Sequence, residues 1–183
     1  MLTALIILGV LVVIAFVWIS IYNSLIKLRT WAEGSFSQID VQLQRRNDLI
    51  PNIVETVKGY ASHERETLEA VTAARQQIMN LPADATPEQI NAMSNQLSGA
   101  LSRLLAVAEA YPDLKASEVY TQTMESVNKF EDNVRHSRMI YNDVVTNLNR
   151  MVRMFPSNLI ASMFNFTEKE YFKGTTSKQD VPS

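Results

Sequence analysis

The chain has 183 residues, a net charge of −2 and a pI near 5.7. It is long enough for one domain plus a membrane segment, and it has no basic field that would draw it to nucleic acid. The absence of cysteine excludes disulfides, thiolate zinc sites and a cysteine nucleophile. Only five Gly and six Pro occur, so the composition favours a few long helices over a turn-rich β fold.

The first segment of the chain is apolar and uncharged. Residues 1–26 carry no charged side chain, and Leu2 to Ile21 is almost entirely Leu, Ile, Val, Ala and Phe. About 20 such residues, at roughly 1.5 Å each, cover the hydrocarbon core of a bilayer, which predicts a transmembrane helix. A cleaved signal peptide would need a basic region before the apolar run and an A-x-A-like exit, so we interpret the segment as an uncleaved anchor.

The residues that flank the apolar run suggest an orientation. Lys27 and Arg29 follow it, and no Lys or Arg precedes it. Because positive charge is retained on the cytoplasmic side, we expect the N-terminus outside and the rest of the chain in the cytoplasm. Trp18 and Tyr22 suit the headgroup layer, but they are equally compatible with ordinary lipid-facing positions.

Beyond the apolar run, one stripe of apolar residues continues in seven-residue steps. Its members are Phe36, Leu43, Ile50, Val57, Val71 and Ile78, with Glu64 in the same row. The stripe predicts one long helix over Phe36–Ile78 that continues the membrane helix. Pro51 cannot donate to the carbonyl of Asn47, so a kink is expected there. The alternative is that Asp48 caps a new helix with Pro51 in its first turn.

Charged residues divide between the stripe and the outer side of this helix. Arg46 and Glu64 fall on or beside the stripe, whereas the residues that face outward are Arg45, Asp48, Lys58 and Glu66. A charge on a stripe can mark a partner site or fix the register of packed helices. The alternative is a solvated face whose long side-chain stems lie over apolar neighbours.

Two further long helices are predicted. The break at Leu81–Ala85 ends the first helix near Asn80. Thr86 and Gln89 form a capping box that starts the second, with Pro87 at its first helical position. Its apolar side comprises Ile90, Met93, Leu97, Leu101, Leu104, Val107 and Ala108, interleaved with small residues at Ser98, Gly99, Ala100 and Ser102. It stops at Tyr111–Asp113.

The third helix is expected from a cap at Ser117 to Phe155. Its seven-residue row is Tyr120, Val127, Val134, Tyr141, Leu148 and Phe155. Such a heptad predicts coiled-coil-like packing against the first helix, in the same chain or in a neighbour.

Pro156 ends the third helix, and a short apolar segment, Ser157–Phe166, follows. Its apolar residues are Leu159, Ile160, Met163, Phe164 and Phe166. It is interpreted either as a cap that folds back on the bundle or as an exposed patch for a partner subunit or a bilayer surface. The chain turns polar from Thr167, and residues 174–183 are expected to be disordered.

Three stretches carry a resemblance to a known family. They are Ser37–Asn52 (SQIDVQLQRRNDLIPN) continuing into Val54–Ala61 (VETVKGYA), Tyr111–Ala116 (YPDLKA) and Phe155–Ala161 (FPSNLIA). Together they resemble the LemA family of bacterial membrane proteins. The resemblance implies a single N-terminal span in the cytoplasmic membrane, an outward N-terminus, a helical cytoplasmic domain and no established enzymatic activity. Asn165 stands where the family pattern has Gly, and Asn tolerates the left-handed conformation next best.

The sequence lacks the common catalytic and metal-binding patterns. A di-iron bundle needs Glu-x-x-His, but Tyr60 stands three residues before His63, and Asn133 stands three residues before His136. The zinc-protease motif that His63 begins lacks its second His at Thr67, so His63 is interpreted as a surface residue. Glycine-rich nucleotide loops and the G-x-S-x-G elbow are missing too. No enzyme activity, cofactor or metal is predicted.

The sequence therefore predicts an all-α fold. An N-terminal transmembrane helix continues into a long kinked helix, which packs with two further antiparallel helices in an elongated coiled-coil-like bundle, and a short C-terminal helix follows. The expected parts are an anchor (1–26), a cytoplasmic bundle (27–166) and a polar tail (167–183). The candidate interaction residues are Gln38, Asp40, Arg45, Arg46, Asp48, Pro51, Asn52, Leu159, Ile160 and Phe164.

Two functions fit these features. The first is a membrane-anchored scaffold that self-associates and organises proteins or membrane at the cytoplasmic face. The alternative is a monomeric adaptor or regulator of a membrane enzyme such as a protease or a signalling complex. The expected partners are the bilayer, further copies of the chain and a membrane protein. Small-ligand sensing has no pocket pattern in the sequence.

Overall fold

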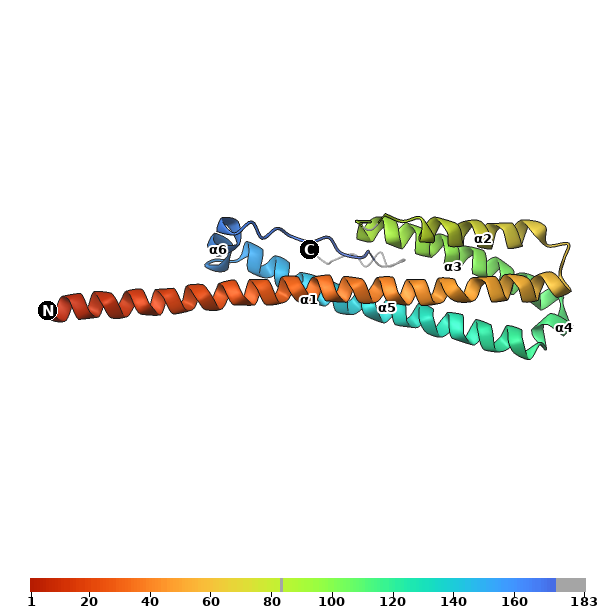
Figure 1. The fold of residues 1–183 in the computed structure, drawn as a ribbon, viewed down its shortest axis with the longest axis horizontal. Coiled ribbons are helices and arrows are strands. Elements are labelled where there is room, and N and C mark those ends of the chain that lie inside the picture. Colours follow the sequence, from red (N-terminus) through yellow and green to blue (C-terminus); the bar gives the residue numbers. More distant parts are fainter. Residues whose placement is uncertain (83, 174–183) are drawn as a thin grey trace, which may run out of the picture. The chain divides into compact units, whose positions relative to one another are not determined.

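The structure is a computed structural model that describes residues 1–82 and 84–173, and these residues form helices without any strand. The helices are α1 (Leu2–Tyr60), α2 (Arg65–Met79), α3 (Pro87–Ala110), α4 (Pro112–Lys115), α5 (Glu118–Arg153) and α6 (Ser157–Met163) (Figure 1). The predicted all-α class is confirmed. The predicted disordered segment, residues 174–183, lies outside the described residues.

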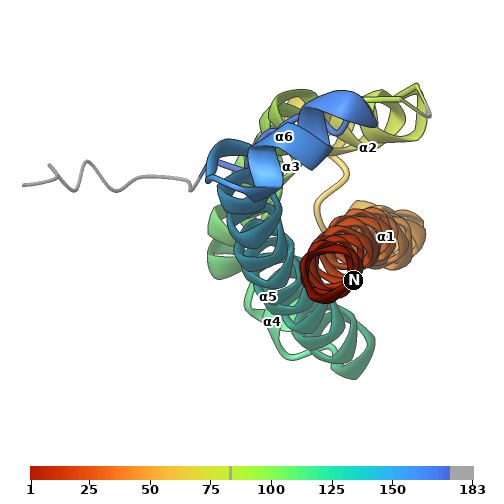
Figure 2. The same cartoon turned by 90° about the vertical axis from the view of Figure 1, so that its left-hand side faces the viewer.

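The chain divides into two compact units. The anchor unit comprises Met1–Ser37 and Met139–Glu170, which are the first part of α1, the last part of α5, and α6. The bundle unit comprises Gln38–Arg138 and the described residues from Tyr171 onward, including α2, α3 and α4. Helices α1 and α5 each contribute to both units. Figure 2 views the helices end-on from the N-terminus of α1.

Helix α1 runs without interruption through Pro51, as the stripe predicts. Pro51 lies on the exposed side of the helix and leaves the Asn47 carbonyl without its usual helical donor. Nε of Arg75, on α2, donates to this carbonyl over 3.1 Å. A side chain from the neighbouring helix therefore replaces the bond that proline removes, and no new helix begins at Asp48.

The prediction of a single helix over Phe36–Ile78 is wrong. Helix α1 ends at Tyr60, a short loop covers residues 61–64, and α2 runs back beside α1 from Arg65 to Met79 (Figure 1). Val57, Ala61, Leu68 and Val71 are all buried. The seven-residue spacing of apolar residues therefore continues through the reversal. Both helices face one core, and the loop is of a length that preserves this spacing. Periodicity alone cannot distinguish this hairpin from a straight helix.

The later helix boundaries follow the predicted signals. At the start of α3, the Gln89 amide donates to Thr86 Oγ1 (3.3 Å) and the Thr86 amide donates to Gln89 Oε1 (2.9 Å), which confirms the capping box. Helix α2 ends at Met79, and α5 begins directly after Ser117. The single turn α4 occupies the expected stop after α3.

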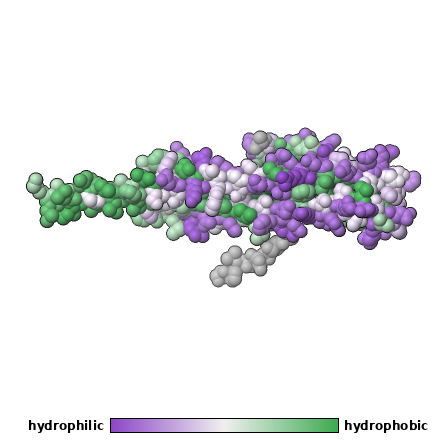
Figure 3. Space-filling model, turned by 60° about the horizontal axis from the view of Figure 1, so that its bottom comes forward, coloured by the Kyte–Doolittle hydropathy of each residue, from purple (hydrophilic) through white to green (hydrophobic). Residues whose placement is uncertain are grey.

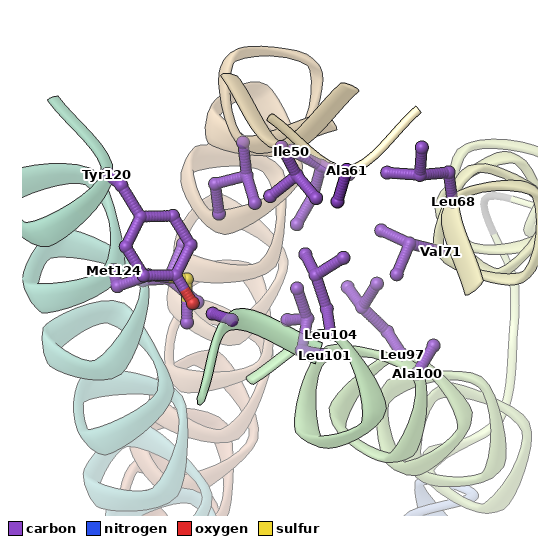
Figure 4. Close-up of a cluster of buried hydrophobic side chains, with 14 of the residues drawn as sticks. Ile50, Ala61, Leu68, Val71, Leu97, Ala100, Leu101, Leu104, Tyr120 and Met124 are labelled. Atoms are coloured by element: carbon purple, nitrogen blue, oxygen red, sulfur yellow. The ribbon is translucent and has the colours of Figure 1, made fainter. Parts of the chain in front are cut away.

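The core of the bundle unit lies between α1, α2, α3 and α5 (Figure 4). Ile50, Leu68, Leu104 and Met124 point into it, one from each of these helices (Figure 4). Because the predicted first helix is split into α1 and α2, the bundle has four long helices of alternating direction rather than three (Figure 1).

In the anchor unit, α6 ends in a Schellman turn. Asn165 has φ 54°, in the left-handed region that the sequence expectation assigned to it. The Phe166 amide donates to the Ala161 carbonyl (2.9 Å) and the Asn165 amide to the Ser162 carbonyl (3.4 Å). The following residues lie along α5, where the Asn149 side chain exchanges two 2.9 Å hydrogen bonds with the backbone of Lys169. Asn165 therefore turns the chain back toward α5.

Candidate functional site

The candidate residues separate into two surfaces and one buried position. We call the exposed residues Gln38, Asp40, Arg45, Asp48, Pro51 and Asn52 the α1 face. We call Met154–Phe164, which includes Leu159, Ile160 and Phe164, the apolar tip. Arg46 belongs to neither surface, because it is buried.

The α1 face is polar and opposite to the bundle core. All six of its residues are exposed, while Ile39, Leu43 and Ile50 on the other side of the helix are buried. The face carries both signs of charge, and Gln44 Nε2 donates to Asp40 Oδ2 over 3.0 Å. Such a surface can contact a helix or loop of another protein through polar groups, but it forms no enclosed site for chemistry.

Arg46 pins three helices of the bundle unit together. Its side chain is 1% exposed, and its Nη2 group donates to Ser98 Oγ on α3 (3.0 Å) and to Glu131 Oε2 on α5 (3.1 Å). Burial lowers the pKa of the Arg46 guanidinium from its ordinary value, and the negative charge of Glu131 partly offsets this. The interpretation of Arg46 as part of a solvated face is wrong. Its contacts fit the register-fixing alternative.

A second arginine, which the sequence analysis did not single out, adds to this cluster. Burial lowers the pKa of Arg138 to about 10, the positive charge of Arg46 lowers this pKa too, and Glu131 raises it. The Arg138 guanidinium lies over the ring of Phe172, 5.4 Å from its centroid. The seven-residue spacing of Glu131 and Arg138 places them on one side of α5. Only tertiary contacts bring Arg46 beside them.

An open groove lies between the end of α1 and α2. It measures about 420 Å³ and is lined by Val54, Lys58, Ser62, Arg65, Leu68, Glu69, Thr72, Ala73 and Gln76. No sequence pattern predicted this groove. Its lining combines apolar and charged side chains, and the Thr72 hydroxyl in it donates to the Leu68 carbonyl over 2.9 Å.

The apolar tip packs on the first part of α1 and remains largely exposed. Ile160 is buried, whereas Leu159 and Phe164 are 53% and 46% exposed. Pro156, Leu159 and Ile160 form one wall of an apolar groove of about 270 Å³, whose other wall is Val13, Ile14, Val17, Trp18 and Ile21 of α1. The Phe164 and Phe166 rings lie 4.7 and 6.1 Å from the ring of Tyr22. One side of α6 therefore covers α1, and the other faces outward.

The first part of α1 is long and apolar enough to cross a membrane, and its most apolar stretch is not buried within the described chain. Figure 3 shows this stretch as a mainly hydrophobic (green) surface. Together with the helical bundle unit, it defines a membrane-associated all-helical protein.

Comparison with known proteins identifies the family. The sequence model of the LemA family matches residues 35–183, and the chain belongs to the LemA family. Protein LemA of Metamycoplasma hominis is 27% identical over 87% of this chain and 72% of its own length. Magnetosome protein MamQ 2 of Paramagnetospirillum magneticum is 26% identical over 93% of this chain and 72% of its own. Magnetosome protein MamQ of Magnetospirillum gryphiswaldense is 24% identical over 82% of this chain and 64% of its own length.

Proposed function

We propose that this protein is a membrane-anchored helical scaffold. It self-associates and organises other proteins or the membrane at the cytoplasmic face of the bacterial cytoplasmic membrane, without catalysing a reaction. The observation that carries this proposal is the continuity of α1, since one helix joins the apolar segment to the bundle unit. The exposed α1 face then extends from a fixed anchor and offers a polar surface to neighbours.

The names of the relatives fit this proposal. The two MamQ proteins are named for the magnetosome, and none of the three names states a reaction. The seven-residue row of α5 adds nothing to this support, because its members Tyr120, Val127, Val134, Tyr141 and Leu148 are buried within the chain itself. Where identical chains do associate, symmetric assembly is the commonest outcome.

Native mass measurement of the full-length protein in mild detergent tests self-association. We expect one defined oligomer that persists on dilution, and a chemical crosslinker should trap the same copy number. A monomer at every concentration would contradict the scaffold. A variant with Arg45→Glu and Asn52→Glu on the α1 face, both at exposed positions, would show whether this face carries the contact.

The α1 face favours a second candidate function, an adaptor that binds a membrane enzyme as a monomer. Its mixed charges and lack of apolar anchors resemble the surface of a transient partner site more than a permanent interface. Arg45→Ala distinguishes the two functions. Loss of a membrane-protein partner in a pull-down, with the oligomer state unchanged, favours the adaptor. Arg46→Ala is unsuitable for this test because Arg46 is buried.

A further inference from the structure

We propose that the apolar tip, Met154–Phe164, is a second membrane-binding element, which lies in the hydrocarbon of the leaflet on the Lys27 side of the span. The protein would then hold the bilayer through the first part of α1 and through the tip beside it. This inference rests on the membrane anchoring in the proposed function. Its occupant is lipid, and not a second chain.

The first argument is position. The groove residues Val13 and Ile21 of α1, which face the tip, both lie inside the uncharged run of residues 1–26. If this run crosses the bilayer, whatever packs beside Val13–Ile21 lies at the same depth. Val13 lies eight residues before Ile21, the end of the stretch that covers the hydrocarbon. At 1.5 Å per residue, the groove therefore reaches about 12 Å into the hydrocarbon.

The second argument is exposure. Beyond Leu159 and Phe164, the tip exposes Met154 (55%), Phe155 (77%) and Met163 (65%). A cap in contact with water would turn side chains of this size inward, since large contiguous apolar patches are uncommon on surfaces that face only water. The neighbouring surface of α1 is apolar and exposed as well, and the two surfaces meet along the apolar groove that they share.

The third argument is the distribution of charge. Residues 154–167 contain no charged side chain, and Arg153 and Glu168 flank them as an ion pair. On α1 the charges begin at Lys27, and Lys169 Nζ lies 4.0 Å from Glu33 Oε1. Charged groups therefore meet charged groups, while the uncharged tip meets the uncharged helix. The ring of Tyr22 contacts Phe164 near the boundary, the level that such rings favour in a bilayer.

The fourth argument is the backbone of the turn. Hydrocarbon tolerates an irregular backbone only where its polar groups have partners. Ser157 Oγ lies 2.7 Å from the carbonyl of Met151, in the last turn of α5, and 2.9 Å from that of Met154, the residue just after it. The Leu159 amide donates to the Pro156 carbonyl (3.3 Å), and the Schellman turn supplies partners at the end of α6. These internal bonds suit the tip for an apolar environment.

Because the chain has no cysteine, single cysteines can report on the tip without background labelling. Met163→Cys and Met139→Cys replace methionines of the anchor unit that are 65% and 60% exposed, one in the tip and one on α5. Val12→Cys, 51% exposed, reports on the span, and Leu159→Cys gives a second tip position. Each full-length variant is labelled with bimane and reconstituted into vesicles of phosphatidylethanolamine and phosphatidylglycerol.

The readout is quenching by a lipid with a nitroxide on its acyl chain, compared with iodide in the buffer. We expect labels at positions 12, 159 and 163 to be quenched several-fold more by the lipid than the label at 139, and only position 139 to respond to iodide. Iodide quenching at 159 and 163 would overturn the proposal, as would protection from both quenchers, which would indicate cover by another chain. If position 12 responds to the lipid and the tip does not, the anchor stands without the tip. If position 12 fails too, the anchoring itself is overturned.

Discussion

Arg46 is the residue at which burial and charge conflict most. Its guanidinium is withdrawn from water, and it is held by Ser98 Oγ and by Glu131, whose own side chain is 37% exposed. Removing one partner of such an ion pair leaves the charge of the other without a counter-charge. Replacing both partners by apolar residues can be neutral, so the pair is better explained by register than by net stability.

We therefore predict that Arg46→Ala lowers the free energy of unfolding by about 1–3 kcal/mol, since it removes charged hydrogen bonds between α1, α3 and α5. Urea unfolding of the full-length protein in mild detergent, followed by circular dichroism, measures this loss. The matched control is Arg45→Ala, an adjacent arginine that is exposed, for which the change should stay within about 0.5 kcal/mol. Equal losses in the two variants would show that Arg46 does not hold the bundle together.

At the scale of the elements, α2 supplies a hydrogen bond that α1 cannot form within its own helix. The Asn47 carbonyl accepts from Arg75 Nε because Pro51 has no amide hydrogen. The α1–α2 hairpin, which the apolar pattern did not reveal, is what brings Arg75 to this carbonyl. The long helix and the hairpin therefore support each other.

A double-mutant cycle tests this dependence. Pro51→Ala should raise the free energy of unfolding by about 1–3 kcal/mol, because the new alanine amide restores the helical donor. Arg75→Met should cost about 1 kcal/mol in the original chain, but close to nothing beside Pro51→Ala, where the carbonyl has a new partner. Urea unfolding of the four proteins gives the coupling energy. Simple additivity would mean that the Arg75 bond does not compensate for the proline.

At the scale of the whole molecule, the charges that flank the apolar run predict the side of the membrane on which the bundle unit lies. Lys27 and Arg29, directly after the run, favour the cytoplasmic side. In spheroplasts, we predict that a membrane-impermeant maleimide reacts with Glu125→Cys, an exposed position of the bundle unit, only after lysis. The control is a cysteine in a short hydrophilic extension added before Met1, which should react before lysis; the extension is needed because Thr3 itself lies within the apolar run. Reaction of Glu125→Cys before lysis would place the bundle unit outside.

Local sequence signals predicted much of the fold. The uncharged run defines the apolar first part of α1, and Thr86, Pro87 and Gln89 start α3 through bonds between residues three apart. Asn165 takes the left-handed conformation expected from its residue type. Each of these outcomes depends on neighbours along the chain, so the amino-acid order is sufficient to predict it.

By itself, the sequence determined the helical class, most helix ends, the membrane-compatible segment and the apolar character of residues 157–166. The tertiary structure decided where the first stripe turns back, that Arg46 is buried between Ser98 and Glu131, and that α6 lies against α1. The physical reason is how far apart in the chain the interacting residues lie. Helix formation, capping and hydropathy depend on residues a few positions apart, whereas a reversal that keeps the apolar phase and a buried ion pair are decided by contacts between residues far apart in the chain.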